Sequence, residues 1–363
     1  MRHIFAIISV IAIMAVPLSG CLDPGGGYTY LSYPEDVTYV FTNKVVFQIN
    51  EGEVDYVISI PFPLELFDGD NLNQHVTEFT ISPGGALTDF HGTDRVEWTG
   101  SAAETITLEY RATVVSSTVN WQHLSKESGY IEDVDEMLNN RYPHDVDQWK
   151  IRPTAPQIKQ IADSIVDRNM TVYEAARAIL DFIENNIQYE AIGGGEPKDC
   201  LQTLSDGVGD CDDQSILYCS IARAAKIPAW LEFGYLFDRE NGYLGPHGWL
   251  ALYLPLKGGG GVKVNIDVAN HNFMYRTSHH ISTWEDIGDP EALRDYYNIT
   301  VYSGIPPFSV HVTSGIELLD AEPSFEEVKI IIDRQDVFIP LSGGLPLLLV
   351  IVATALLVHI RRK

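Results

Sequence analysis

Apolar and polar residues alternate in short runs from Tyr28 to about Trp121, which is the pattern of β-strands with one buried face. Turns rich in glycine, asparagine, aspartate and proline separate these runs. Short strands at this spacing are typical of a β-sandwich, which we expect at residues 28–122. The expected strands are Val37–Phe41, Val45–Ile49, Tyr56–Ile60, Val76–Ile81 and Thr105–Tyr110.

Beyond Arg141 the apolar period becomes that of amphipathic helices. Two capping-box signatures, Thr154-Ala155-Pro156-Gln157 and Thr171-Val172-Tyr173-Glu174, each precede apolar residues at helical spacing. A third helix is expected to start near Cys211 and to end before Pro228, because proline cannot continue a helix.

After this helix the period falls to two, which predicts three further strands. They are Trp230–Phe237, Trp249–Leu254 and Val262–Val268, with glycines 258–261 joining the last two as a hairpin. Lys263, Asn265 and Asp267 are expected to share one face of the last strand, since side chains alternate along a strand.

Helices followed by strands indicate an α+β domain, which we place at residues 150–285. Residues 286–337 show no clear pattern and are expected to be a juxtamembrane segment of uncertain fold. They either add strands to the core or form a stalk.

The N-terminal residues 1–21 have the pattern of an export signal, with a short basic start before an apolar run from Ile4 to Leu18. The run ends in Leu18-Ser19-Gly20-Cys21, which resembles a lipobox, and we expect a lipid on Cys21. The alternative is an ordinary signal peptide that contains a cysteine by chance.

The C-terminal residues 338–360 are apolar over about the length that a transmembrane helix needs. Arg361, Arg362 and Lys363 follow at once and are expected on the cytoplasmic side by the positive-inside rule. Both ends therefore predict a cell-membrane protein with most of its chain on the extracytoplasmic side.

The charge composition argues against nucleic acid as a partner. The 363 residues include 50 acidic and 24 basic side chains, and the formal net charge of −26 disfavours nucleic acid. The length suffices for two domains with substantial cores.

The candidate chemistry lies at the start of the third helix, in Gly207-Val208-Gly209-Asp210-Cys211-Asp212-Asp213. Asp210 is a natural N-cap and Cys211 follows as the first helical residue, where free N–H groups and the helix dipole favour a nucleophilic thiolate. Neighbouring aspartates oppose another anion, so the hypothesis requires a histidine nearby.

His247 is expected to supply that imidazole from the start of the second strand, and Asp267 lies on the polar face of the third strand. Neighbouring strands are about 4.8 Å apart, so the two side chains can be hydrogen-bonded. Cys211, His247 and Asp267 would then be nucleophile, base and orienting acid of an acyl transfer through a thioester. Its oxyanion hole would use the Cys211 N–H with Tyr189 or Gln202 as second donor.

The stretch from Cys200 to Tyr235, CLQTLSDGVGDCDDQSILYCSIARAAKIPAWLEFGY, resembles the core of the transglutaminase-like superfamily. His247-Gly248-Trp249 and Asp267 match the later motifs of that family, in the same order. Lys226 stands where the family usually has glycine, and Ala251 stands where an acid is common. The resemblance implies a papain-like core of a cysteine acyltransferase or protease, with the triad at the three matched positions.

The expected protein is thus a cell-surface enzyme that transfers acyl groups on envelope proteins or peptides, by amide cross-linking or by hydrolysis. The alternative is a catalytically silent scaffold of the same fold that binds envelope partners. We expect no cofactor and no metal. His271, His279 and His280 lack a recognised ligand spacing, and the aspartates around Cys211 lack the glycine pattern of a calcium loop.

The remaining cysteines, Cys200 and Cys219, allow two readings. A disulfide is permitted outside the cell, and two separate buried thiols are equally compatible with the sequence.

Overall fold

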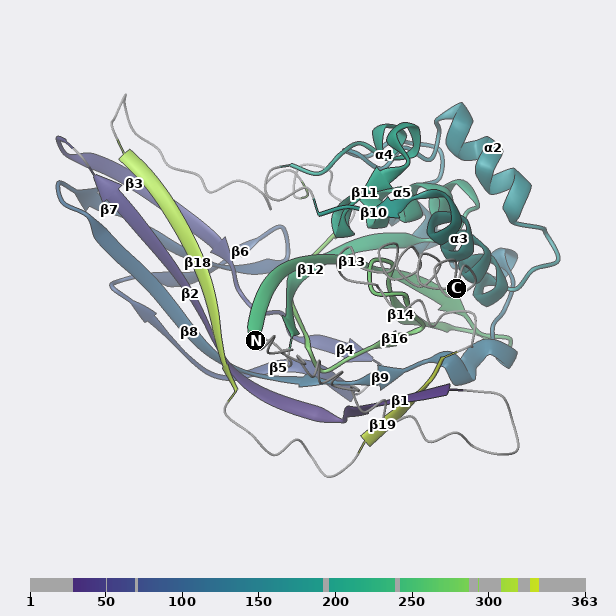
Figure 1. Ribbon diagram of the computed structural model, residues 1–363, viewed down its shortest axis with the longest axis horizontal. Helices are drawn as coiled ribbons and strands as arrows, with labels where there is room; N and C mark the ends of the chain where they lie inside the picture. Colours follow the sequence, from purple (N-terminus) through teal and green to yellow (C-terminus); the bar gives the residue numbers. More distant parts are fainter. Residues whose placement is uncertain are drawn as a thin grey trace, which may run out of the picture. The chain divides into compact units, whose positions relative to one another are not determined.

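The computed structural model describes residues 29–49, 51–68, 71–191, 196–238, 242–286, 293, 308–318 and 327–332 (Figure 1). The expected signal peptide with Cys21 and the expected membrane helix at 338–360 lie outside these residues. None of the helices within the described ranges combines the length and apolar character required to span a bilayer.

The chain divides into two compact units, Ser32–Ile330 and a second unit of residues 1–31 with 331–363. Strands β1 (Thr29–Pro34) and β19 (Glu327–Ile332) pair as a two-stranded sheet. All that follows concerns the first unit, which is mostly sheet with a few helices.

Its N-terminal half forms two antiparallel sheets around a shared apolar core. One sheet has the order β18-β2-β8-β5-β4 and the other β3-β7-β6. Large side chains from both sheets, among them Phe41, Ile58 and Trp98, meet in this core. The bounds are β2 (Asp36–Ile49), β3 (Val54–Pro61), β4 (Leu66–Asp68), β5 (Asn71–Ser82), β6 (Ala86–Phe90), β7 (Thr93–Ala102), β8 (Ile106–Ser117) and β18 (Phe308–Leu318).

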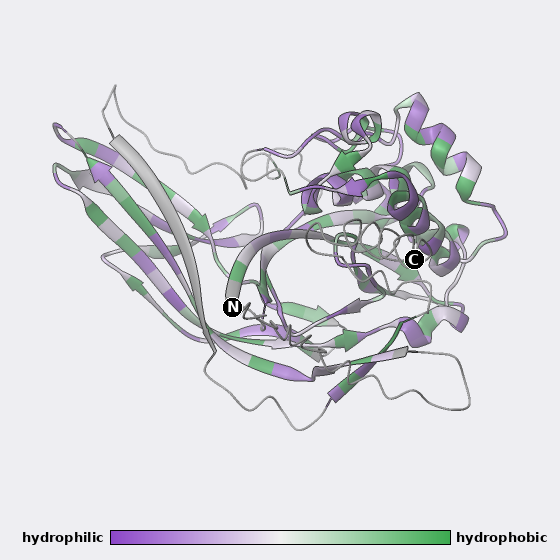
Figure 2. Ribbon diagram, in the orientation of Figure 1, coloured by the Kyte–Doolittle hydropathy of each residue, from purple (hydrophilic) through white to green (hydrophobic). Residues whose placement is uncertain are grey.

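Two expected strands proved to be one, because β2 continues through Thr42, Asn43 and Lys44. These residues keep pairing with Arg111, Tyr110 and Glu109 of β8, so the polar stretch does not form a turn. Buried and more exposed positions alternate along the whole strand. The hydropathy colours of Figure 2 show both apolar and polar residues on the strands of this half.

Strand β18 pairs with β2 from Phe308 to Leu318. Part of the segment that we expected to be a stalk or an addition to the core therefore belongs to the N-terminal sheet instead.

The second half is built on an antiparallel sheet of order β15-β14-β13-β12-β17. The helices cover one face of it (Figure 1). Ile216 and Leu217 of α5 (Cys211–Ala224) share one apolar core with Leu231, Leu250 and Val264 of the sheet. The bounds are α2 (Pro156–Ile165), α3 (Val172–Asn186), α4 (Cys200–Asp206), β12 (Ala229–Asp238), β13 (Tyr243–Pro255), β14 (Gly261–Asp267), β15 (Asn272–Phe273) and β17 (His280–Glu285). Short elements complete the unit, namely β9 (Val119–Asn120), η1 (Gln122–Lys126), η2 (Ile131–Asp133), α1 (Glu136–Arg141), β10 (Gln188–Tyr189), β11 (Val208–Gly209) and β16 (Tyr275–Arg276).

Of the two predicted capping boxes, one caps its helix and the other does not. Thr171 caps α3 as expected, with Glu174 reaching back to the Thr171 N–H at 2.8 Å. Thr154 does not cap α2, because its hydroxyl bonds to Asp147 at 2.8 Å and Ala155 takes the N-cap position.

The other face of the sheet is buried and polar along its middle strands. Trp249 of β13 donates its indole N–H to Glu232 of β12 at 2.8 Å, and Glu232 also pairs with Lys263 of β14 at 2.5 Å. Asp267 continues this polar row at the end of β14, as alternation along the strand predicts.

Candidate active site

Cys211 is the first residue of α5, and its neighbours fix that helix start. Asp213 accepts the backbone N–H of Asp210 at 3.4 Å and that of Lys198 at 2.6 Å. Gly209 is needed beneath this turn, since a Cβ there would lie 2.8 Å from the Cβ of Asp213. Cys211 is thereby held at the N-terminal end of α5, which is the positive end of the helix dipole.

His247 lies between Cys211 and Asp267. Its Nε2 is 2.8 Å from Asp267 Oδ2, and Cys211 lies close enough to raise the pKa of the imidazole. Because Nε2 of His247 is bonded to the Asp267 carboxylate, Nδ1 is the ring nitrogen that can interact with the Cys211 sulfur. The structure therefore brings the three predicted residues together, from α5, β13 and the end of β14.

One detail of the sequence prediction is wrong: His247 lies inside β13 and not at its start. The strand begins at Tyr243 because Tyr243, Leu244 and Gly245 already pair with residues of β12.

Two opposite effects act on the protonation of His247. Burial lowers the pKa of His247, but the Asp267 carboxylate and the hydrogen bond to Cys211 outweigh burial and raise this pKa to about 10. Burial likewise raises the pKa of Asp267, while the charge and hydrogen bonds of His247 and the hydrogen bond of His280 hold it far below its usual range. At neutral pH the pair is thus an imidazolium beside a carboxylate.

Asp267 has two further partners that the sequence analysis missed. Its Oδ2 accepts a hydrogen bond from Asn270 Nδ2 at 2.7 Å and lies 3.1 Å from His280 Nε2. Asn270 had a local signal, because Asp267 Oδ1 also accepts the Asn270 backbone N–H at 3.3 Å, a common turn geometry. His280 has no recognised metal-ligand spacing with His271 and His279 in the sequence, and His271 bonds Glu184 at 2.8 Å in the structure.

Comparison with known proteins identifies this core. A model of the transglutaminase-like superfamily matches residues 159–265, which include Cys211 and His247 and end just before Asp267. The chain carries a transglutaminase-like core. No curated protein matches it.

One solved structure shares its fold, and another is similar over part of the chain. A candidate cysteine protease from Cytophaga hutchinsonii superposes with a TM-score of 0.56 at 15% identity, over 84% of this chain and 100% of that one. The periplasmic domain of TgpA from Pseudomonas aeruginosa gives a TM-score of 0.34 at 14% identity, over 66% of this chain and 88% of that one.

Two groups of side chains in the described part of the transglutaminase-like core have the make-up of a metal site. They are His247, Asp267 and His280, and Asp210, Asp212 and Asp213. In the first group the atoms that would bind an ion already bond to one another, at 2.8 and 3.1 Å. In the second group Asp212 and Asp213 accept backbone N–H groups at the start of α5. We assign a metal to neither group.

The two candidate oxyanion donors are placed differently. Tyr189 pairs with Gly209 next to the helix start, and burial with the nearby charges of Cys211 and Asp210 raises the pKa of its phenol. Its hydroxyl therefore keeps its proton. Gln202 donates instead to Asp206 at 2.6 Å on the exposed side of α4.

Cys200 and Cys219 are separate, buried thiols and form no disulfide. Burial raises the pKa of Cys200 to about 11 and that of Cys219 to about 12. Among the cysteines in the described ranges, Cys211 is the one with an accessible side chain.

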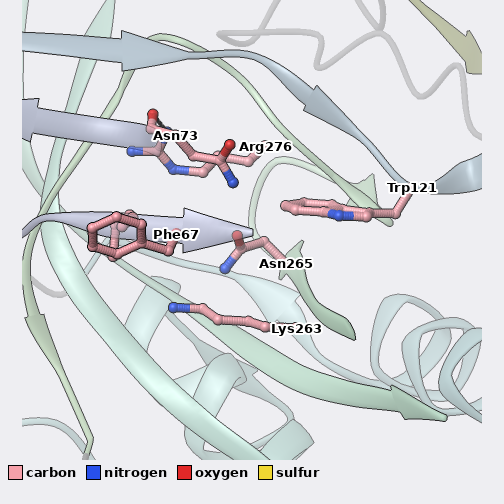
Figure 3. Close-up of a pocket in the computed structure, with 7 residues that line it drawn as sticks. Phe67, Asn73, Trp121, Lys263, Asn265 and Arg276 are labelled. Atoms are coloured by element: carbon pink, nitrogen blue, oxygen red, sulfur yellow. Dashed lines mark hydrogen bonds between the residues drawn. The ribbon is translucent and has the colours of Figure 1, made fainter. Parts of the chain in front are cut away.

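A small pocket lies on the polar face of β14 (Figure 3). Its two cations are already neutralised or bonded, since Lys263 pairs with Glu232 and Glu285 and Arg276 donates to Gln74 at 2.8 Å. We therefore assign this pocket no substrate. Its lining consists of Leu66, Phe67, Asn73, Trp121, Lys263, Asn265 and Arg276.

The free energy of unfolding is expected to depend on the proton of His247. The folded-state pKa of about 10 lies above the unfolded value of about 6.5, so the folded state binds the proton more tightly. This stabilisation, on the order of a few kcal/mol, is complete below pH of about 6.5 and is lost as the pH rises through about 10. Urea unfolding of the wild type and of His247→Gln across this range measures it. An equal loss of stability in both proteins would contradict the assignment.

Proposed function

We propose that this protein is a cysteine-dependent acyl-transfer enzyme, in which Cys211 is the nucleophile, His247 the acid and base, and Asp267 the orienting carboxylate. The observation that carries the proposal is that His247 lies 2.8 Å from Asp267 and close enough to Cys211 for the Cys211 side chain to raise the pKa of His247. The transglutaminase-like core and the fold shared with a candidate cysteine protease support it.

The reaction begins with Cys211 as thiolate and His247 as imidazolium. The sulfur attacks the carbonyl carbon of a substrate amide, and His247 gives its proton to the departing nitrogen, so that the C–N bond breaks and a thioester remains. A primary amine or water then attacks the thioester. His247 removes the proton of the attacking group and the thiolate of Cys211 is restored.

The negative oxygen that forms at each step requires donors. The Cys211 backbone N–H at the start of α5 is one, and the Tyr189 hydroxyl is the second in this proposal. An amine acceptor gives a cross-linked amide, and water gives hydrolysis.

We place this chemistry outside the cytoplasm, with proteins or peptides of the cell envelope as substrates. The support is the sequence at both ends, residues 1–21 and 338–360. A membrane span at the C-terminus and a lipid on Cys21 would hold the enzyme beside those substrates.

The test is labelling of the full-length protein with iodoacetamide at neutral pH, followed by peptide mass spectrometry. We expect Cys211 to be labelled, and the rate to fall by about 100-fold or more in His247→Ala. The matched control is His123→Gln, an exposed histidine of η1, which should label like the wild type. Labelling that is unaffected by His247→Ala would favour the silent scaffold.

The reaction products distinguish cross-linking from hydrolysis. A glutamine peptide is offered with and without a primary amine, and the products are weighed. A mass gain equal to the amine minus ammonia shows cross-linking, and conversion of glutamine to glutamate in the absence of amine shows hydrolysis.

A further inference from the structure

His280 contacts the same oxygen of Asp267 as His247 does, although it lies on β17, at the opposite edge of the sheet from β15. We propose that His280 is a positioning residue that fixes the Asp267 carboxylate for His247, and that the N-terminal sheet holds His280 in place. The inference rests on the proposed function and adds to it a residue beyond the matched range 159–265.

The hydrogen bonds determine the tautomer of His280. An ionised carboxylate only accepts, so His280 Nε2 must carry the proton that faces Asp267 Oδ2 at 3.1 Å. Nδ1 then accepts from the Thr277 hydroxyl at 2.9 Å. The Thr277 carbonyl oxygen lies farther from Nδ1, at 3.3 Å, and already accepts the His280 backbone N–H at 3.1 Å. Burial lowers the pKa of His280 despite Asp267, so the ring is neutral and leaves the negative charge of the carboxylate to His247.

The ring of His280 cannot turn away from this position. It is 2% exposed and packs edge-on against Trp249, with the ring centres 5.0 Å apart. Trp249 is itself fixed by its hydrogen bond to Glu232. The carboxylate of Asp267 is therefore held from three sides, by His247, Asn270 and His280.

The backbone of His280 is fixed by side chains from the N-terminal sheet. Its carbonyl accepts from Ser116 Oγ of β8 at 2.7 Å and from Arg276 Nη2 at 2.7 Å. The same Arg276 donates to Gln74 Oε1 of β5 at 2.8 Å and to Ser116 Oγ at 3.1 Å. All of these groups are buried, so water does not compete for the bonds.

The N-terminal sheet thus reaches the catalytic group through one short chain of hydrogen bonds, from Ser116 to His280 to Asp267. An orienting group displaced by about 1 Å costs about 100-fold in rate. The N-terminal sheet accordingly supports the active site from behind Asp267.

The variants are His280→Phe, which keeps the ring and its packing but has no donor, and His280→Gln, which restores an N–H. With a glutamine peptide and the full-length protein, we expect His280→Phe to lower kcat about 10-fold to 100-fold at unchanged KM. His280→Gln should recover most of this loss. Ser116→Ala should lower kcat severalfold, whereas its neighbour Ser117→Ala, whose hydroxyl bonds Asp36 on the exposed side, should not.

Histidine NMR of the ¹⁵N-labelled full-length protein in detergent gives a readout that needs no turnover. We expect a neutral His280 with its proton on Nε2, and a shifted His247 signal in His280→Phe. An Nδ1–H tautomer, an unchanged His247 signal, or wild-type kcat in a folded His280→Phe would each overturn the proposal. If Cys211 of the wild type does not react while these signals are as expected, the proposed function fails and the positioning contact stands.

Discussion

Replacement of Asp267 by asparagine is expected to lower kcat by about 1,000-fold to 10,000-fold, while the protein remains folded. The carboxylate accepts from His247, Asn270 and His280 through a single oxygen. An amide in its place carries no charge, and its NH2 group must face either these three donors or the Asn270 backbone N–H, which the other oxygen of Asp267 accepts. His247 then loses both its proton affinity and its orientation towards Cys211.

The same substitution shifts the pH range in which the enzyme works. The Asp267 charge is the largest influence that raises the pKa of His247 to about 10, so this pKa falls when the charge is removed. Activity of Asp267→Asn should therefore decline at lower pH than that of the wild type. The measurements are kcat, KM and the iodoacetamide rate of Cys211 as functions of pH.

Asp206→Asn is the matched control. It removes the same negative charge, but at the exposed C-terminal end of α4. Asp206 pairs with Lys198 at 3.2 Å and accepts from Gln202. Asp206→Asn should keep kcat within about twofold of the wild-type value, since an exposed ion pair contributes little. Wild-type kcat in Asp267→Asn would show that the geometry of this site is not catalytic.

Helix capping and side-chain alternation were sufficient to predict the features of the site that depend on one helix or one strand. The helix start at Cys211 follows from the capping residues Asp210 and Asp213, and the side of β14 that carries Asp267 follows from alternation along the strand. The contact of His247 with Asp267 needed only that their strands be neighbours, which a glycine-rich hairpin makes the default.

The contact of His280 with Asp267 could not be predicted from capping or alternation. This contact depends on β17 pairing with β12, far along the chain, and periodicity predicts strands without predicting their order. The same limit explains β18, whose place beside β2 joins residues at opposite ends of the chain.

Replacement of Gly234 by alanine is expected to destabilise the protein by about 3 kcal/mol or more. A Cβ at this position would lie 2.0 Å from the carbonyl oxygen of Ile281, which is backbone of the neighbouring strand and cannot rotate away. Urea unfolding of the full-length protein measures the loss. The control is Gly258→Ala in the β13–β14 hairpin, where a Cβ meets nothing within 4 Å and should change the stability by less than about 0.5 kcal/mol.

The close approach at Gly234 also has a consequence for the site. Gly234 pairs with His247 on one side and with Ser282 on the other, and the β12–β17 register shifts at this point. The missing side chain lets β17 lie close enough for His280 to reach Asp267 across the sheet. In Gly234→Ala that remains folded at low temperature, kcat should therefore fall at unchanged KM, as in His280→Phe. A variant that lost stability but kept wild-type kcat would show that the approach of the two strands serves the fold alone.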